Sequence, residues 1–348
     1  MSDGQTSPPL AAGKIPVALL VELLSELPPA RSELRLGPGL GEDACAIEIG
    51  GETLVVAADP VTLTAGEAGF LAVVVNANDV AVTGARPRWF LATVLVPPGT
   101  TAVDVRDVFA DIGRGLELVG AHLVGGHTEV TPAVRQPVVV GQMLGTVADG
   151  RVVATGGART GDVLVQVGTA PIEGAAVLAR AAGARLDAVG PAALDAARQA
   201  LRRPGISVVE PALAAARLGA TALHDPTEGG LAAALHELAH ASGVRLRVER
   251  EAVIWFEPGI ALCRAFGADP WATLASGALL AAFPASGVGG AVRALTADGH
   301  RAAVIGRVEE GSGVRDSRGR EIPWPEQDEV ARLASAGGDR GARRQHAP

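Results

Sequence analysis

Short apolar stretches followed directly by acidic, glycine or histidine residues recur along this chain, and this pattern favours an α/β fold. In three examples, residues 53–58 are followed by Asp59, residues 121–124 by GGHTEV at 125–130, and residues 221–224 by DPTEGG at 225–230. Helical patterns alternate with these stretches, as in proteins that pack helices on a sheet. Because ligands of open α/β sheets gather beyond the carboxyl ends of the strands, we expect the polar residues to form a site.

A glycine-rich loop with two carboxylates, GPGLGED at residues 37–43, precedes the first of these strands. The backbone N–H groups at Gly39 and Gly41 could form a nest for phosphate oxygens, because glycine lets an anion approach the backbone closely. Asp43 beside them could hold a hard cation. The alternative is a mobile turn with solvated acids, since short glycine patterns also occur by chance.

The stretch 67–83 reads as a strongly apolar helix that carries Asn76, Asp79 and Thr83 on one face. A carboxylate in such a helix is costly unless it is paired or bound to a metal, so Asp79 favours a site over a chance solvated face. Asp59 follows a strand, as a ligand would, although an acid could also cap the turn before Pro60.

The composition argues against several classes of function. The chain has 348 residues, enough for two domains, and its net charge of −8 argues against binding nucleic acid or an anionic membrane. No apolar run reaches the roughly 18 residues of a membrane span. Two cysteines, Cys45 and Cys263, are too few for a disulfide framework, so we expect a cytoplasmic protein.

Lys14 is the only lysine, and its surroundings exclude a P-loop, whose lysine follows G-x-x-x-x-G. Phosphate binding would therefore depend on glycine N–H groups, metal ions and arginine. The run His236-Glu237-Leu238-Ala239-His240 matches H-E-x-x-H, which on a helix places two histidines together for zinc. Its alternative is a solvated helix face, because so short a motif arises easily in an alanine- and leucine-rich helix.

Seven segments of the chain stand in an order that is typical of one family. They are GPGLGEDA at 37–44, ADPVT at 58–62, NANDVAVTGARP at 76–87, GGHTEV at 125–130, PGISVV at 204–209, HDPTEGGL at 224–231 and ASGALLA at 275–281. On these segments the chain resembles the aminoimidazole ribonucleotide synthetase-like (PurM-like) ATP-binding superfamily. Within it, the chain is most similar to the HypE-like branch, which GKIP at 13–16 also resembles. It departs from that branch in lacking a C-terminal cysteine, since its last cysteine is Cys263.

The resemblance implies a mixed α/β (α+β) fold of two PurM-like domains, in a homodimer whose N-terminal sheets form a shared barrel. We expect the N-terminal ATP-binding domain at residues 13–150 and the C-terminal α/β domain at residues 151–322. The polar ends, 1–12 and 323–348, are expected to be disordered.

The resemblance also implies roles for single residues. Asp43, Asp59 and Asp79 would bind Mg²⁺, and Asp225 would reach the metal–phosphate cluster. Together with the glycine loop, it gives the residues that would contact the nucleotide or its phosphates: Gly39, Gly41, Asn76, Asn78, Gly125, Gly126, His127 and Thr128. Many members have an acid where this chain has His127, so Glu129 would supply the missing carboxylate ligand of the metal.

We therefore expect an ATP- and Mg²⁺-dependent enzyme in which Asp43, Asp79 and Asp225 are catalytic. It would phosphorylate or activate a small-molecule or protein acceptor, at a carbonyl or amide oxygen or at a phosphate, and release ADP. Two other functions stay open at this point. One is a non-catalytic nucleotide-binding partner or sensor, and the other is a zinc hydrolase at His236, Glu237 and His240.

Overall fold

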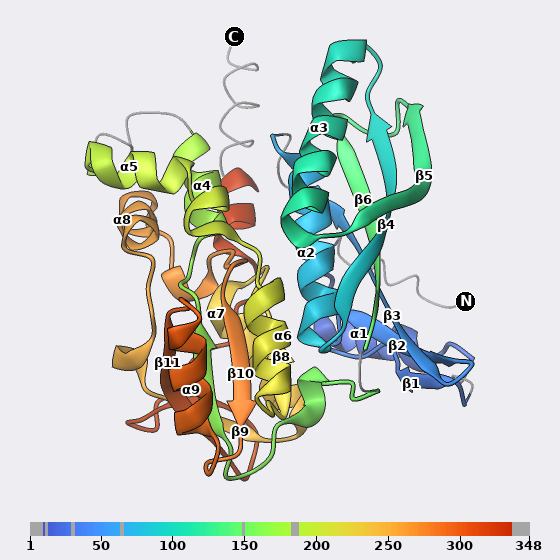
Figure 1. Cartoon of the computed structure of the whole chain (residues 1–348). Coiled ribbons are helices and arrows are strands. Elements are labelled where there is room, and N and C mark those ends of the chain that lie inside the picture. The colour runs from blue at the N-terminus through green and yellow to red at the C-terminus, as the bar shows by residue number, and fades with distance from the viewer. Residues whose placement is uncertain are drawn as a thin grey trace, which may run out of the picture.

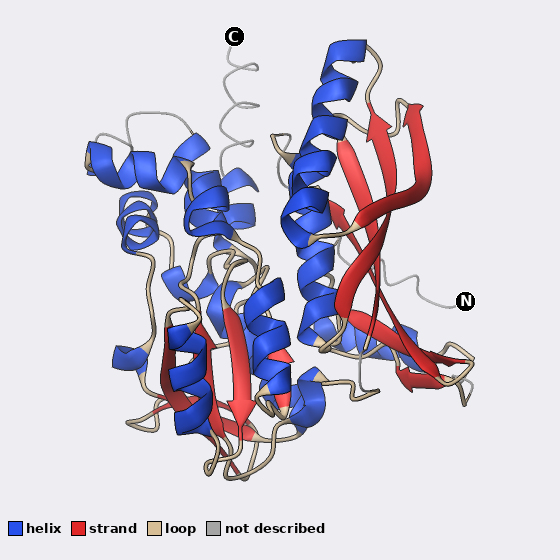
Figure 2. Ribbon diagram, viewed as in Figure 1, coloured by secondary structure: helices blue, strands red, loops and turns tan. Residues whose placement is uncertain are grey.

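The computed structural model of the chain describes residue 10 and residues 13–28, 32–62, 66–147, 150–181 and 188–335. Two six-stranded mixed sheets, each with helices packed on it, account for most of these residues (Figure 2). The expected mixed α/β fold is confirmed. Most of the segment 1–12 and all of 336–348, which the sequence predicts to be disordered, lie outside the described residues.

The first sheet follows helix α1 (Val17–Ser25). Its strands, in order across the sheet, are β1 (Leu34–Leu36), β2 (Ala44–Ile49), β3 (Glu52–Val61), β6 (Val138–Thr146), β4 (Arg86–Val96) and β5 (His122–Val130). All neighbouring strands are antiparallel except β4 and β5, which are parallel. Buried and partly exposed residues alternate along β6 and most of β4, because one face of the sheet packs against a helix.

That helix, α2 (Ala68–Val82), lies at the centre of the molecule. All of its residues except Val75 are buried. It contacts β3 and β6, then α3 (Ala102–Val119), and also α6 (Val209–Arg217), which belongs to the second half of the chain (Figure 1). A helix that is apolar all round is buried all round, so its few polar side chains are placed inside the protein.

The second sheet is built from β12 (Gly313–Asp316), β9 (Arg245–Val248), β11 (Ala302–Glu309), β7 (Val163–Val167), β10 (Leu279–Phe283) and β8 (Ala222–His224), in that order. Alternate residues of β10 divide between two cores. Phe283 belongs to the core that includes α2, α6 and α9 (Val288–Ala297), and Leu280 to the core that includes α7 (Gly230–Ser242). Helices α4 (Glu173–Arg180), α5 (Pro191–Arg198) and α8 (Glu257–Phe266) pack on one another.

The segment GGHTEV lies inside β5, whereas the sequence predicts a loop after a shorter strand. Gly126 has a φ of 147°, and a Cβ at this position would overlap the backbone of Ala92 on β4. Glycine is therefore required here for the close approach of two strands. β5 is an edge strand of the sheet, and all of its residues are exposed.

Two other boundaries also differ from the prediction. β3 continues through Asp59 to Val61, so Asp59 is a strand residue and does not follow the strand. Part of the segment 323–335, which belongs to the predicted tail, is buried. Asp328 is only 5% exposed, and its carboxylate accepts a hydrogen bond of 2.8 Å from the N–H of Gly229, at the start of α7. The packed chain therefore continues beyond residue 322.

Among the helices in the described part of the chain, none combines the length and the apolar character needed to cross a membrane.

Candidate functional site

Four aspartates from distant segments of the chain converge on one place. β2 and β3 are antiparallel neighbours, and this pairing sets Asp43, just before β2, beside Asp59 on β3. Asp79 is supplied by α2, and Asp225 directly follows β8. The charges of Asp225, Asp59 and Asp43 all act on Asp79, so the four carboxyl groups share one local field.

Asn76 fixes the backbone of Asp59. Its side-chain oxygen accepts a hydrogen bond from the N–H of Asp59 at 2.8 Å. Its amide nitrogen donates to the carbonyl oxygens of Asp59, at 3.2 Å, and of Ala72, at 2.8 Å. Asn76 is fully buried, so its amide holds the strand that carries an acid.

Asn78 fastens α2 to the second half of the chain. Its amide nitrogen donates to the carbonyl oxygen of Ile206 at 2.9 Å, and its oxygen accepts from the N–H of Val208 at 2.8 Å. This side chain is also fully buried. Asn76 therefore positions a strand that carries an acid, whereas Asn78 joins α2 to the segment 206–208, and the contact of either side chain with a nucleotide stays a prediction.

Burial raises the pKa values of the acids in this cluster. It raises the pKa of Asp59 to about 6, with the charge of Asp43 adding to the shift and that of Lys14 opposing it. It raises the pKa of Asp225 to about 7, again with a contribution from Asp43. The pKa of Asp79 is raised well above its ordinary value by burial and then by Asp225. Ionising all of these groups needs a nearby positive charge.

Several buried polar atoms of the cluster have no hydrogen-bond partner among the described residues. They are Oδ2 of Asp79, both carboxylate oxygens of Asp225 and Nδ1 of His224. A buried carboxylate is costly unless it is hydrogen-bonded, ion-paired or bound to a metal. Since carboxylate oxygens are the ligands that Mg²⁺ prefers, these residues fit a divalent cation.

Three residues that the sequence analysis did not assign to this site extend it. Nε2 of His224 lies 2.9 Å from Oε2 of Glu237, and Nζ of Lys14 lies 3.5 Å from Oε1 of Glu237. The sequence offers a signal for two of these residues, since His224 begins the segment HDPTEGGL and Lys14 is the only lysine. The sequence does not show that Glu237 connects them, because Lys14 and Glu237 are 223 positions apart.

The hydrogen bond between His224 and Glu237 shifts both groups toward their charged forms. Although burial lowers the pKa of His224, this bond and the charges of Glu237 and Asp43 raise it to about 9. Although burial raises the pKa of Glu237, the same bond and the charge of Lys14 lower it to about 2. Two basic side chains, Lys14 and His224, therefore lie among the acids of this cluster.

The glycine loop is tied to the second half of the chain by Glu42. The carboxylate of Glu42 accepts hydrogen bonds from the N–H groups of Gly156, at 3.0 Å, and Thr155, at 3.3 Å. Gly41 has a φ of 79°, and a Cβ there would lie 3.1 Å from Cβ of Glu237. Gly41 is thus required for packing on α7, and a phosphate nest at Gly39 and Gly41 stays a prediction.

The segment with Gly125, Gly126, His127, Thr128 and Glu129 lies apart from the acids within one chain. Across the sheet, Asp59 pairs with Gly141, Gly141 with Ala92, and Ala92 with Gly126. Three strand spacings of about 4.8 Å separate Asp59 from Gly126 by roughly 14 Å. On β5, His127 and Glu129 pair with each other at 3.2 Å, and both are exposed.

The side chains of the H-E-x-x-H segment do not favour the zinc site left open as an alternative, and the segment is not a solvated helix face either, because His236 and Glu237 are buried. Nε2 of His236 lies 2.7 Å from the carbonyl oxygen of Ile322, and its ring stacks on Trp324. His240 contacts the edge of the same Trp324 ring, while Glu237 turns to His224. Within the described ranges, the group of three side chains placed to hold a metal is Asp43, His224 and Asp225.

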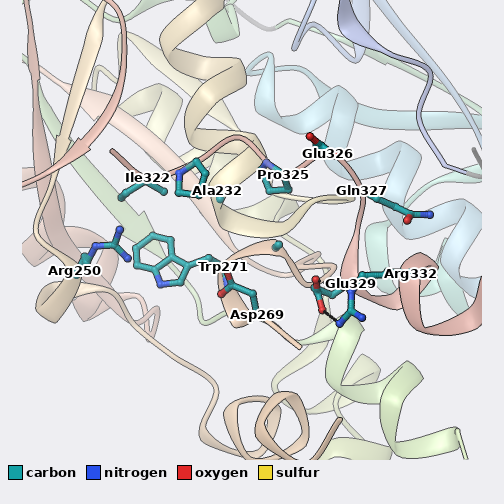
Figure 3. A pocket seen from close by; sticks show the side chains of 12 residues that line it. Ala232, Arg250, Asp269, Trp271, Ile322, Pro325, Glu326, Gln327, Glu329 and Arg332 are labelled. Atoms are coloured by element: carbon teal, nitrogen blue, oxygen red, sulfur yellow. Dashed lines mark hydrogen bonds and ion pairs between the residues drawn. The ribbon is translucent and has the colours of Figure 1, made fainter. Parts of the chain in front are cut away.

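A cavity of about 360 Å³ lies elsewhere, between α7, the turn at Trp271 and the segment 322–332 (Figure 3). Arg250 lies over the ring of Trp271, and Glu329 pairs with Arg332 at its rim. None of the four aspartates lines this cavity. The acid cluster is therefore the candidate active site.

Comparison with known proteins gives matches over most of the chain. Residues 41–147 match the N-terminal domain of AIR synthase related protein, and residues 159–317 match its C-terminal domain. Carbamoyl dehydratase HypE of Rhodobacter capsulatus is 33% identical over 252 residues, which are 71% of this chain and 72% of that protein.

Solved structures share the fold. Hydrogenase maturation protein HypE in complex with ATP has a TM-score of 0.66 and 23% identity, over 85% of this chain and 92% of its own. AaThiL complexed with AMPPCP and TMP has a TM-score of 0.69 and 21% identity, over 90% of this chain and 95% of its own. The chain therefore belongs to the AIR synthase related (PurM-like) family, in which the HypE carbamoyl dehydratases are its relatives.

Proposed function

We propose that this protein is an ATP- and Mg²⁺-dependent enzyme that uses the terminal phosphoryl group of ATP. The observation that carries the proposal is the convergence of Asp43, Asp59, Asp79 and Asp225, with buried carboxylate oxygens that no described residue satisfies. The relative HypE, which has been solved with ATP, supports this nucleotide. Mg²⁺ bound at such a site neutralises phosphate charge during phosphoryl transfer.

The side chains of the cluster have different parts in this proposal. The side chain of Asp43 is one-third exposed and marks the solvent side of the cluster, which we call its entrance. Asp79 and Asp225 are buried at the inner side. The inner acids hold negative charge in a place that excludes water, and this strengthens their interaction with a cation. Lys14, half exposed, presents a positive amine near the entrance for an anionic substrate.

The acceptor is proposed to be a carbonyl or amide oxygen, or a phosphate, of a small molecule or a protein. Transfer forms the bond from the acceptor oxygen to the γ-phosphorus, breaks the bond from that phosphorus to the β–γ bridging oxygen, and releases ADP. Direct transfer is favoured over a cysteine intermediate, because Cys263 is buried and burial raises the pKa of its thiol to about 11. The two thiols suit a reducing, cytoplasmic environment.

We further propose that the protein acts as a homodimer joined through β5. This edge strand exposes apolar Leu123, Val124 and Val130, which is unusual for a strand with unpaired backbone groups. Within one chain its glycine segment lies three strand spacings away from Asp59. A second copy bound at this edge could bring His127, Thr128 and Glu129 to a shared site.

Titration calorimetry with ATP and Mg²⁺, followed by an ADP-release assay over carbamoyl, amide and phosphate acceptors, tests the proposal. Asp43→Asn and Asp79→Asn are expected to abolish ATP turnover without changing the circular dichroism spectrum. Asp107→Asn, on the exposed face of α3, is the matched control and should keep full turnover. Normal turnover in either site variant would refute the assignment.

A nucleotide-binding partner or sensor is the competing function. It would bind ATP at the same acids and would lose affinity for ATP in Asp43→Asn, as the enzyme would. It would release no ADP with any acceptor. The pair of measurements therefore separates the two functions, because binding and turnover are read independently.

A further inference from the structure

The histidine beside the acid cluster offers a nitrogen ligand that the sequence did not lead us to expect. One ligand atom each from Asp43, His224 and Asp225 lie within 4.8 Å of one another. His224 is 2% exposed and Asp225 is 1% exposed. Nδ1 of His224 and both carboxylate oxygens of Asp225 are buried without a hydrogen-bond partner among the described residues. These unsatisfied atoms all belong to one small group.

The other ring nitrogen of His224 is already committed. Nε2 lies 2.9 Å from Oε2 of Glu237, whose second oxygen, Oε1, lies 3.5 Å from Nζ of Lys14. When Nε2 carries the proton and donates it to Glu237, Nδ1 presents a lone pair to the two aspartates. A carboxylate that holds one ring nitrogen in this way is the usual partner of a metal-bound histidine, because it fixes the tautomer and the ring orientation.

A purely ionic role for His224 explains the geometry less well. Nδ1 lies 3.8 Å from Oδ2 of Asp43, too long for a hydrogen bond. An imidazolium ring would therefore bury an N–H group at Nδ1 without a hydrogen-bond acceptor, while both carboxylate oxygens of the neighbouring Asp225 lack donors. A cation between the three side chains satisfies all of these atoms together.

We propose that one cation position of the site is bound by Nδ1 of His224 together with carboxylate oxygens of Asp43 and Asp225, and that it prefers Mn²⁺ over Mg²⁺. This inference rests on the proposed function, since it concerns the same site. Mg²⁺ favours an all-oxygen octahedral shell, whereas a mixed nitrogen and oxygen site binds first-row transition ions, and among these Mn²⁺ also takes carboxylate ligands. Glu237 is a positioning residue, acting through the histidine.

Electron spin-echo spectroscopy of the full chain loaded with Mn²⁺ alone tests the proposal directly. Imidazole nitrogen bound to Mn²⁺ gives a ¹⁴N modulation, and protein labelled with ¹⁵N at histidine should replace it with the ¹⁵N signal. This readout needs neither ATP nor turnover. It also needs no variant, so it holds even if a substitution prevents folding.

Variants then assign the signal to a residue. His224→Gln is expected to remove the nitrogen modulation and to weaken Mn²⁺ binding by at least about tenfold, with a smaller effect on Mg²⁺. His300→Gln, outside the cluster, is the matched control and should keep both. Glu237→Gln should keep the modulation but weaken Mn²⁺ binding, because the ring loses its charged partner.

Two outcomes would overturn the proposal. Mn²⁺ bound without any histidine nitrogen signal means an all-oxygen site, and ATP turnover in that protein would leave the proposed function intact. A nitrogen signal that persists in His224→Gln means that another histidine is the ligand. Loss of ATP binding in Asp79→Asn, by contrast, tests only the proposed function.

Discussion

Asn76 and Glu42 illustrate how single side chains set the positions of the acids. Asn76 uses its whole amide on the backbone of Asp59 and Ala72, and Glu42 bonds the N–H groups of Thr155 and Gly156. Neither needs a ligand for its hydrogen bonds. Their contribution to function is to hold β3 and the glycine loop where Asp59 and Asp43 meet.

Replacing Asn76 with alanine should therefore affect stability and cation binding together. The variant removes the hydrogen bonds to the part-buried backbone N–H and carbonyl of Asp59, and an additional bond to the Ala72 carbonyl of α2, so the free energy of unfolding should fall by about 2–3 kcal/mol. Urea unfolding measures this loss, and calorimetry measures Mg²⁺ affinity. Asn78→Ala is the comparison, because it removes bonds to Ile206 and Val208 only. An equal loss of Mg²⁺ affinity in both variants would contradict the positioning role of Asn76.

Chemical labelling can test whether Lys14 lies near the bound phosphates, because it is the only lysine of the chain. An acyl-phosphate derivative of ATP transfers its acyl group to a lysine near the bound phosphates, and this chain has only one lysine. We expect labelling at Lys14 that excess ATP prevents, seen by peptide mass spectrometry. Lys14→Arg should still bind ATP and show only background labelling of the N-terminal amine. Labelling of Lys14 that ATP does not reduce would place the amine outside the substrate site.

The elements of secondary structure show where local patterns suffice and where they fail. The stretch 67–83 is long enough to predict a helix rather than a strand, and α2 spans Ala68–Val82. Because this helix is apolar all round, it is buried. The GGHTEV segment predicts a loop but lies within β5, since its glycines serve the close approach to β4. Glycine permits both conformations, and only pairing with a neighbouring strand selects one.

The exposed edge strand β5 gives a prediction at this scale. Val124 on β5 is 56% exposed and Val103 on α3 is 60% exposed. Val124→Lys should convert the proposed homodimer to a monomer and lower the proposed ATP turnover, because a charge on the edge opposes strand pairing. Val103→Lys, the control, should leave both unchanged. Light scattering after gel filtration gives the mass, and a dimer that survives Val124→Lys would exclude this edge as the interface.

At the scale of the whole molecule, the acid cluster makes stability depend on pH and cations. The folded protein raises the pKa values of Asp59 and Asp225 from 3.8 to about 6 and about 7. The folded state thus binds protons more tightly than the unfolded state. The stability from these groups is full below the unfolded pKa and is lost as the pH rises through about 6 to 7.

A divalent cation competes with those protons, so it should stabilise the protein most where they have left. We expect the rise in melting temperature caused by Mg²⁺ to be close to zero at about pH 5 and to reach several degrees at about pH 8. Thermal unfolding with and without Mg²⁺ at each pH measures this. Asp225→Asn should reduce the rise at the higher pH. A rise of equal size at both pH values would mean that Mg²⁺ binds elsewhere.

The sequence by itself determined the mixed α/β fold, the buried helix with Asp79 and the candidate aspartates, because these follow from local apolar patterns and from motifs in a fixed order. Only the tertiary structure decided which residues meet. It joined Lys14, His224 and Glu237 into one chain of contacts, set GGHTEV apart from the acids, and turned His236 toward Ile322. Such contacts depend on strand register and on packing between distant segments, which no local pattern of residues encodes.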